Sequence, residues 1–157
     1  MTATKTLVAG IGNIFNGDDG FGSEVAQRLA RRPMPDGVHV EDYGIRGVHL
    51  AYELLEGYDL VVLIDALPRG EAPGTVSVLV PDVDLDDVPP LDSHQMDPRA
   101  VLGMVAELGG EIGRLLLVGC EPADVGEGIG LSPPVAAAVD DAARMVEELI
   151  AQKEEIR

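Results

Sequence analysis

The chain has 157 residues, of which 46% are hydrophobic, with 28 acidic and 11 basic side chains and a formal net charge of −17. This length and composition predict a single domain over residues 1–157 and argue against a disordered chain or a fibrous repeat. The charge argues against nucleic-acid binding and against an anionic membrane surface, because both need a basic patch.

Strand-like and helical patterns alternate in the first part of the chain. Residues 6–10 and 38–42 predict two strands, and residues 60–65 predict a very apolar third strand, which we expect in the middle of the sheet. Residues 22–32 place apolar side chains on one helical face before two prolines end the helix, and residues 48–55 predict a shorter helix. This alternation is typical of α/β proteins with parallel strands.

The fourth predicted strand, residues 74–80, follows the third too closely for a parallel connection. Only residues 66–74 are available to join the two strands, whereas a parallel crossover needs roughly a dozen residues or more. We therefore expect this strand to run antiparallel to the others. A loop rich in proline and aspartate follows over residues 81–96, and loops of that length within compact domains are often functional.

The second half of the chain completes a layered arrangement. A helix capped by Asp97 is predicted over residues 98–108, a fifth strand over residues 114–120, and a final helix capped by Ser132 over residues 133–152. In both helices a proline follows the capping side chain directly. The order of elements predicts a three-layer α/β/α sandwich around a mixed, mostly parallel five-stranded sheet with one antiparallel strand.

Three features are expected at the carboxyl ends of the strands, where ligands collect in parallel α/β sheets. Asp65 ends a very apolar strand, in surroundings where an unpaired carboxylate is costly. The glycine-rich loop over residues 10–22 carries the acidic pair Asp18 and Asp19, and the long loop carries His94. One imidazole and two carboxylates from three loops would form a first-row metal site with open positions, suited to nickel, zinc or iron.

Structural interpretations of the same residues stay open. Asp65 can cap neighbouring backbone amides, the pair Asp18 and Asp19 can complement the dipole of the following helix, and His94 can be a surface histidine. Cys120 ends the fifth strand with no histidine near it in sequence, which favours a structural thiol over a nucleophile.

The single cysteine also bears on location. Cys120 cannot form an internal disulfide, so we expect a reducing compartment. The N-terminal apolar run leads into acidic residues rather than a small-residue cleavage site, which indicates a strand and not a signal peptide. No apolar run approaches the roughly 18–20 residues of a membrane span. Together these observations predict a cytoplasmic protein.

Two other functional interpretations share parts of this pattern. Gly10 and Gly12 after the first strand, with Asp42 ending the second, imitate a dinucleotide-binding fingerprint, but Phe15 stands at the third glycine position. Acidic side chains also lie where a pyrophosphate would sit. A phosphoacceptor receiver domain likewise has an acidic pair after its first strand and an aspartate ending its third, but here no lysine follows the fifth strand.

Four motifs resemble those of a known family. The stretches GIGNIFNGDDGFG, LIDAL, SHQM and GIGLSPPV are similar, in order and spacing, to the hydrogenase maturation endopeptidases. These enzymes trim the C-terminal extension from the large subunit of nickel–iron hydrogenases. The resemblance extends from the first strand to the last helix and implies a mixed five-stranded sheet with one antiparallel strand.

The resemblance also implies site residues. The family's divalent-metal ligands, carried over by motif, fall on Asp19, Asp65 and His94, with Asp19 preferred to Asp18 because it aligns with the family's acidic position. These three are the expected catalytic residues through the metal, with Asp42 as a second-tier candidate. The implied metal is nickel supplied by the substrate, for which zinc or cadmium can substitute.

The chain departs from the family after the second strand. Members often read DGGTxG there, whereas this chain has DYGIRG over residues 42–47, with Ile45 in place of the threonine. A polar contact is thereby lost. We expect Tyr43 and Arg46 to contact the substrate peptide instead, and specificity to differ here.

The implied function is endopeptidase cleavage of a hydrogenase large-subunit precursor after nickel insertion, so that cleavage checks metal loading. No HExxH helix is present, so the usual zinc-protease arrangement does not apply. A non-catalytic nickel-binding maturation factor would use the same ligands, and a receiver-type signalling domain would use Asp65 as phosphoacceptor. The expected partner is the precursor, with no nucleic acid or membrane, and the protein is expected to act as a monomer.

Overall fold

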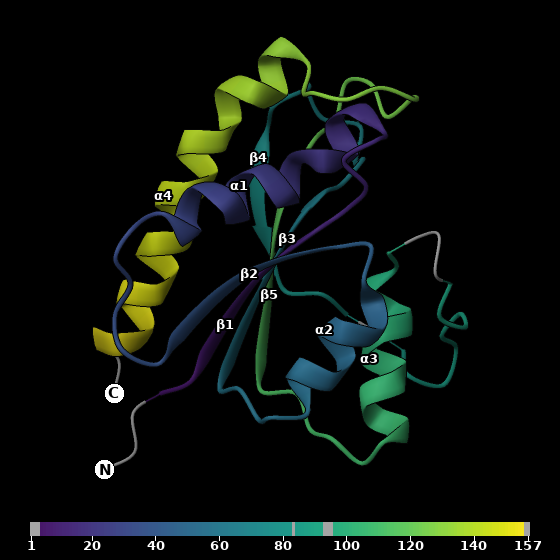
Figure 1. The fold of residues 1–157 in the computed structure, drawn as a ribbon, viewed down its shortest axis with the longest axis vertical. Helices are drawn as coiled ribbons and strands as arrows, with labels where there is room; N and C mark the ends of the chain where they lie inside the picture. Colours follow the sequence, from purple (N-terminus) through teal and green to yellow (C-terminus); the bar gives the residue numbers. More distant parts are fainter. Residues whose placement is uncertain (1–3, 83, 93–95, 156–157) are drawn as a thin grey trace.

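The architecture is taken from a computed structural model, which describes residues 4–82, 84–92 and 96–155. A five-stranded sheet of order β2-β1-β3-β5-β4 runs through the middle of the molecule (Figure 1). Its strands are β1 (Thr6–Ile11), β2 (Val38–Gly44), β3 (Leu60–Ala66), β4 (Val76–Leu79) and β5 (Arg114–Cys120). The central position of β3 is confirmed, and so is the antiparallel direction of β4 against β5.

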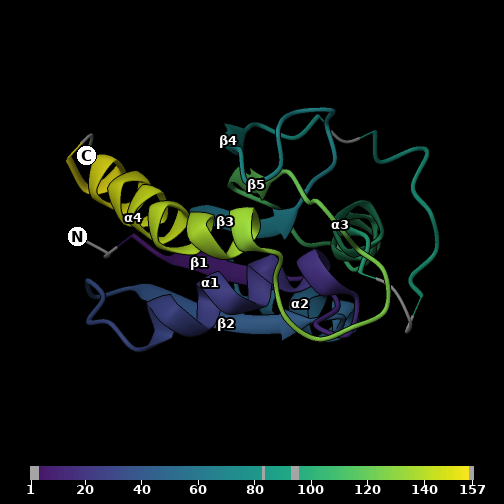
Figure 2. The ribbon, with the colours of Figure 1, turned by 90° about the horizontal axis from the view of Figure 1, so that it is seen from above.

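Helices cover both faces of the sheet (Figures 1 and 2). One face carries α1 (Phe21–Ala30) and α4 (Pro133–Glu155), and the other carries α2 (Gly47–Leu54) and α3 (Pro98–Glu107). The predicted three-layer α/β/α sandwich is therefore confirmed. In the part of the chain that the structure describes, no helix combines the length and the apolar character needed to cross a membrane.

The apolar run of β3 is explained by its position between two helical layers. Leu60 to Ile64 are each at most 3% exposed, because Val62 and Ile64 pack under α1 and α4 while Val61 and Leu63 pack under α2 and α3. A strand buried on both faces reads as a continuous hydrophobic run rather than an alternating one. This burial carries the end of β3, with Asp65, into the interior.

Two glycines allow α1 to lie directly on the sheet. A Cβ atom on Gly10 would lie 2.2 Å from the carbonyl oxygen of Gly22, and one on Gly22 would lie 2.1 Å from that of Ile64. Any side chain at either position would push the helix away from β1 and β3. The short helix η1 (Gly17–Gly20), which sequence reasoning did not separate from α1, is thus held at the carboxyl edge of the sheet.

The ends of elements account for the other differences. Asp97 caps α3 as predicted, since its carboxylate accepts a hydrogen bond from the Arg99 backbone N–H at 3.0 Å. Ser132 lies at the start of α4 as predicted, but only its backbone carbonyl bonds to the helix, accepting a hydrogen bond from the Ala136 N–H at 2.8 Å. Its hydroxyl instead donates to the carboxylate of Asp18.

Candidate active site

Asp65 is the next-to-last residue of β3, at the carboxyl edge of the sheet. Its Oδ1 atom is buried and has no hydrogen-bond partner among the residues that the structure describes. Burial, and after it the negative charge of Asp19, raise the pKa of Asp65 well above the usual range. A carboxylate in this state gains free energy from binding a proton or a cation.

Asp19 belongs to η1, and Gly12 lies between the backbone of Asp19 and the side chain of Asp65. One carboxylate oxygen of Asp19, Oδ2, accepts a hydrogen bond from the Asn13 backbone N–H at 2.8 Å, which orients the side chain. Gly12 has a φ of +130°, and a Cβ there would lie 2.0 Å from the Asp19 carbonyl oxygen and 3.4 Å from Oδ1 of Asp65. Only glycine therefore lets η1 approach the end of β3 this closely.

Asp18 has a different role from its neighbour Asp19. It is fully buried, and its Oδ2 accepts from the backbone N–H groups of Ala123 and Asp124 at 2.8 and 2.9 Å. Ser132 donates to the same carboxylate twice, through its backbone N–H at 2.7 Å and its hydroxyl at 2.8 Å. Burial opposes ionisation of Asp18, but these hydrogen bonds outweigh it and hold its pKa below the usual value. Asp18 thus anchors the loop that precedes α4.

A groove of about 330 Å³ lies beside Asp19 and the end of β3. Its walls come from the glycine-rich loop, the turn after β2, the last residue of β3 and the segment that follows it, the loop after β5, and the residue before Asp97. They consist of Asn13, Asn16, Asp19, Ile45, Ala66, Pro68, Met96, Pro122 and Val125. The position of Met96 confirms that the long loop after β4 returns to the carboxyl edge of the sheet.

The third expected ligand, His94, lies outside the described residues. Within the residues that are described, no group of three or more histidine, cysteine, aspartate or glutamate side chains is arranged to hold a metal ion. Of the three predicted ligands, the structure places Asp19 and Asp65 close enough together for the charge of Asp19 to raise the pKa of Asp65.

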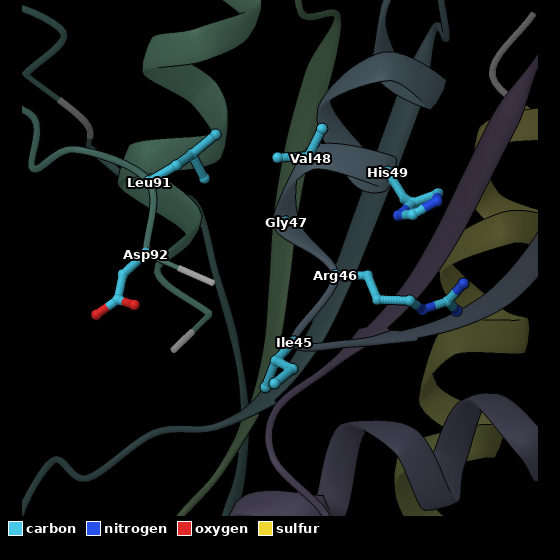
Figure 3. Close-up of a pocket in the computed structure, with 7 residues that line it drawn as sticks. All are labelled: Ile45, Arg46, Gly47, Val48, His49, Leu91 and Asp92. Carbon is cyan, nitrogen blue, oxygen red and sulfur yellow. The ribbon is translucent and has the colours of Figure 1, made fainter. Parts of the chain in front are cut away.

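A second groove, of about 540 Å³, shares Ile45 with the first (Figure 3). Figure 3 shows residues 45–49 on one wall and Leu91 with Asp92 on the other. Arg46 is half exposed at this wall, and its guanidinium donates to the backbone carbonyls of Asp42 and Tyr43.

The expectation that Tyr43 contacts substrate is wrong. Tyr43 is 1% exposed and packs in the hydrophobic core beneath α2 and α3, because β2 continues beyond Asp42 to Gly44. Arg46 stays in place as the candidate for a substrate contact in the DYGIRG segment.

Asp42, the second-tier candidate, joins β2 to α1. Its carboxylate accepts hydrogen bonds from the Ser23 hydroxyl at 2.7 Å, the Gln27 side-chain amide at 3.1 Å and the Gly44 backbone N–H at 3.0 Å.

Cys120 is fully buried, and burial raises the pKa of its thiol to about 11. This arrangement of Cys120 is that of a structural thiol.

The sequence predicts only a capping role for Asp97, but its negative charge also contributes to the raised pKa of Asp65. Its own pKa is lowered, chiefly by the hydrogen bond from the Arg99 side chain. Asn13 and Asn16, which are not among the predicted site residues, both line the groove beside Asp19. The available signal was position, since Asp97 directly follows the SHQM motif and both asparagines belong to the glycine-rich motif.

Comparisons with known proteins show similarities over most of the chain. A family model described as hydrogenase maturation protease matches residues 23–149. The chain is 34% identical to the hydrogenase expression/formation protein HoxM of Azotobacter vinelandii, over 98% of this chain and 75% of that protein. It is 30% identical to a putative hydrogenase maturation protease of Methanocaldococcus jannaschii, over 93% of this chain and 96% of that one.

Solved structures show the same similarity. The hydrogenase maturating endopeptidase HybD from E. coli matches with a TM-score of 0.79 and 27% identity, over 96% of this chain and 94% of that chain. A hydrogenase 2 maturation peptidase from Thaumarchaeota archaeon SCGC_AB-539-E09 matches with a TM-score of 0.73 and 30% identity, over 94% of this chain and 99% of that chain.

Proposed function

The chain belongs to the hydrogenase maturation protease family and is an endopeptidase, and from this premise we propose that it removes the C-terminal extension of a nickel–iron hydrogenase large-subunit precursor after nickel insertion. The observation that carries the proposal is the buried Oδ1 of Asp65, which lies beside Asp19 and has no hydrogen-bond partner in the described part of the chain. Two adjacent carboxylates, one of them desolvated, attract a cation and repel an anionic ligand such as a phosphate.

The chemistry of the candidate ligands fits nickel carried by the substrate. Carboxylate oxygens and an imidazole nitrogen suit nickel, zinc or cadmium, and Asp19, Asp65 and His94 leave open positions on such an ion. An incomplete ligand set favours an ion that arrives with ligands of its own. We therefore treat nickel as part of the substrate, which links cleavage to prior metal loading.

Each residue then has a defined task. Asp65, fixed by β3, and Asp19, oriented by the Asn13 N–H, would bind the ion, and His94 would complete the set. A divalent ion held there would polarise a carbonyl or lower the pKa of a bound water. The groove beside Asp19 would receive the chain around the scissile bond, and Arg46 at the adjoining wall would contact the substrate peptide.

The decisive experiment compares two forms of one precursor. The purified protein is incubated with nickel-loaded and with nickel-free large-subunit precursor, and the products are weighed by mass spectrometry. We expect loss of a C-terminal peptide from the nickel-loaded form alone. Equal cleavage of the nickel-free form would contradict recognition of nickel, and an unchanged mass of both forms would contradict the proposed substrate.

A further inference from the structure

Four exposed apolar side chains lie on the two loops that border the groove beside Asp19. Ile14 and Phe15 belong to the glycine-rich loop, and Val125 and Ile129 belong to the loop between β5 and α4. Phe15 is 60% exposed and Ile129 is 79% exposed. We call these four side chains the apolar rim. Exposed apolar side chains on adjoining loops are candidates for an interaction surface.

Hydrogen bonds hold the two loops of the apolar rim together. The Gly128 N–H donates to the Phe15 carbonyl at 2.8 Å, and the Gly17 N–H donates to the Gly128 carbonyl at 2.8 Å. The buried carboxylate of Asp18 adds the bonds to Ala123, Asp124 and Ser132 described above. The backbone beneath the rim is therefore fixed before any partner binds, which lowers the entropic cost of association.

The position of the apolar rim indicates what covers it. Val125 lines the groove that holds Asp19, so a polypeptide cleaved there passes directly beside the rim. The groove of about 330 Å³ accommodates only a short stretch of chain, whereas a specific protein–protein interface buries roughly 800 Å² on each partner. Most of the contact with a folded substrate must therefore come from surface outside the groove.

The negative charges beside the apolar rim indicate the chemistry of the partner surface. Asp124 and Glu127 are exposed on the same loop as Val125 and Ile129, and the whole chain carries a net charge of −17. A complementary surface is apolar at its centre and flanked by lysine or arginine.

We propose that the apolar rim docks the folded body of the large-subunit precursor, through an apolar surface flanked by basic residues next to its C-terminal extension. This inference rests on the proposed function and adds a second binding element to it. The groove receives the scissile segment, while the rim contributes affinity for the precursor.

The test uses one pair of replacements at matched exposure. Ile129→Ser alters the rim, and Val80→Ser alters a side chain that is 77% exposed after β4, outside both grooves. Because both positions are exposed, we expect melting temperatures within about 2 °C of wild type. Steady-state processing of nickel-loaded precursor should show a KM at least about tenfold higher for Ile129→Ser with kcat unchanged. Phe15→Ser should behave as Ile129→Ser does, and Val80→Ser should match wild type.

The outcomes separate this inference from the proposed function. Wild-type cleavage with an unchanged KM in Ile129→Ser and Phe15→Ser would overturn the docking role and leave the proposed function intact. If wild type does not cleave the precursor, the proposed function fails, and the dissociation constant of the uncleaved precursor then decides the docking role. Equal affinity of Ile129→Ser and wild type would overturn it. A change confined to self-association of the free protein in sedimentation would also overturn it, in favour of a second copy of this chain.

Discussion

Asp18 and Asp65 are two carboxylates near the same edge of the sheet, and their surroundings differ in one respect that decides their roles. Asp18 accepts hydrogen bonds from Ala123, Asp124 and Ser132, and these bonds lower its pKa despite burial. Oδ1 of Asp65 accepts none from the described residues, and burial raises the pKa of that carboxyl. A buried carboxylate with its bonds made stabilises the fold, whereas one with an open oxygen is available to a ligand.

The largest expected difference between the two is in metal affinity. Asp65→Asn and Asp19→Asn should each weaken binding of zinc or cadmium by about 100-fold or more, since changes even to groups outside the ligand set cost 10–100-fold. Asp18→Asn should change the affinity far less. Isothermal titration with metal alone measures this, with exposed Asp36→Asn as the control. Equal losses in Asp18→Asn and Asp65→Asn would break the distinction between the two carboxylates.

The second prediction concerns the free energy of unfolding, which we expect Asp18→Asn to lower and Asp65→Asn not to lower. Asp18→Asn should lower the free energy of unfolding by about 2–3 kcal/mol, because an amide nitrogen would face a backbone donor where a carboxylate oxygen accepted. The loss should be seen in urea unfolding followed by circular dichroism. An unfolding free energy equal to that of wild type would show that the bonds of Asp18 do not hold the loop before α4.

The third prediction follows from the opposite directions of the two pKa shifts. A raised pKa in the folded state means that the contribution of Asp65 to stability is greatest below about pH 4 and falls as pH rises through the raised value. In chelator-treated samples near neutral pH, Asp65→Asn should therefore be more stable than wild type by roughly 1–2 kcal/mol. The gain should vanish in acid, as thermal unfolding at a series of pH values would show. A constant gain at every pH would mean that ionisation of Asp65 is not its cause.

The pKa shift of Asp18 has the opposite sign to that of Asp65. Its pKa is lowered, so its contribution is present above about pH 4 and is lost as pH falls through the lowered value. The difference in stability between wild type and Asp18→Asn should accordingly shrink in strong acid.

The smallest expected effect tests whether burial or bonding matters more. Asp140 pairs with Arg28 between α4 and α1, but its side chain is 65% exposed. Asp140→Asn should lower the free energy of unfolding by only about 0.5 kcal/mol, because exposed ion pairs contribute little. Urea unfolding beside Asp18→Asn gives the comparison. A loss as large as that of Asp18→Asn would show that bonding alone, without burial, accounts for the stabilising role.

Much of this arrangement could be predicted from local sequence. The short connection before residues 74–80 is sufficient to predict that this strand is antiparallel. The very apolar run before Asp65 is sufficient to predict both a central strand and a carboxylate that is costly to bury. The division between Asp18 and Asp19 was not accessible in the same way. It depends on Ser132, which lies more than a hundred positions away along the chain and contacts Asp18 only through the tertiary fold.

Tyr43 shows a second reason for a wrong prediction. The expected strand ended at Asp42, which placed Tyr43 in a loop that faces substrate, whereas β2 extends to Gly44 and directs the ring into the core. The ends of strands are set by backbone pairing with neighbouring strands, here β1, and local propensity does not contain that information. His94, the remaining predicted ligand, lies outside the described residues and stays a prediction.

The role of Asp65 in cleavage is tested most directly by the processing of nickel-loaded precursor by wild type and Asp65→Asn at equal concentrations, followed by mass spectrometry of the large subunit. We predict that wild type releases the C-terminal peptide, while Asp65→Asn, although folded and more stable near neutral pH, leaves the precursor at its full mass. Release of the peptide by Asp65→Asn at the wild-type rate would contradict it.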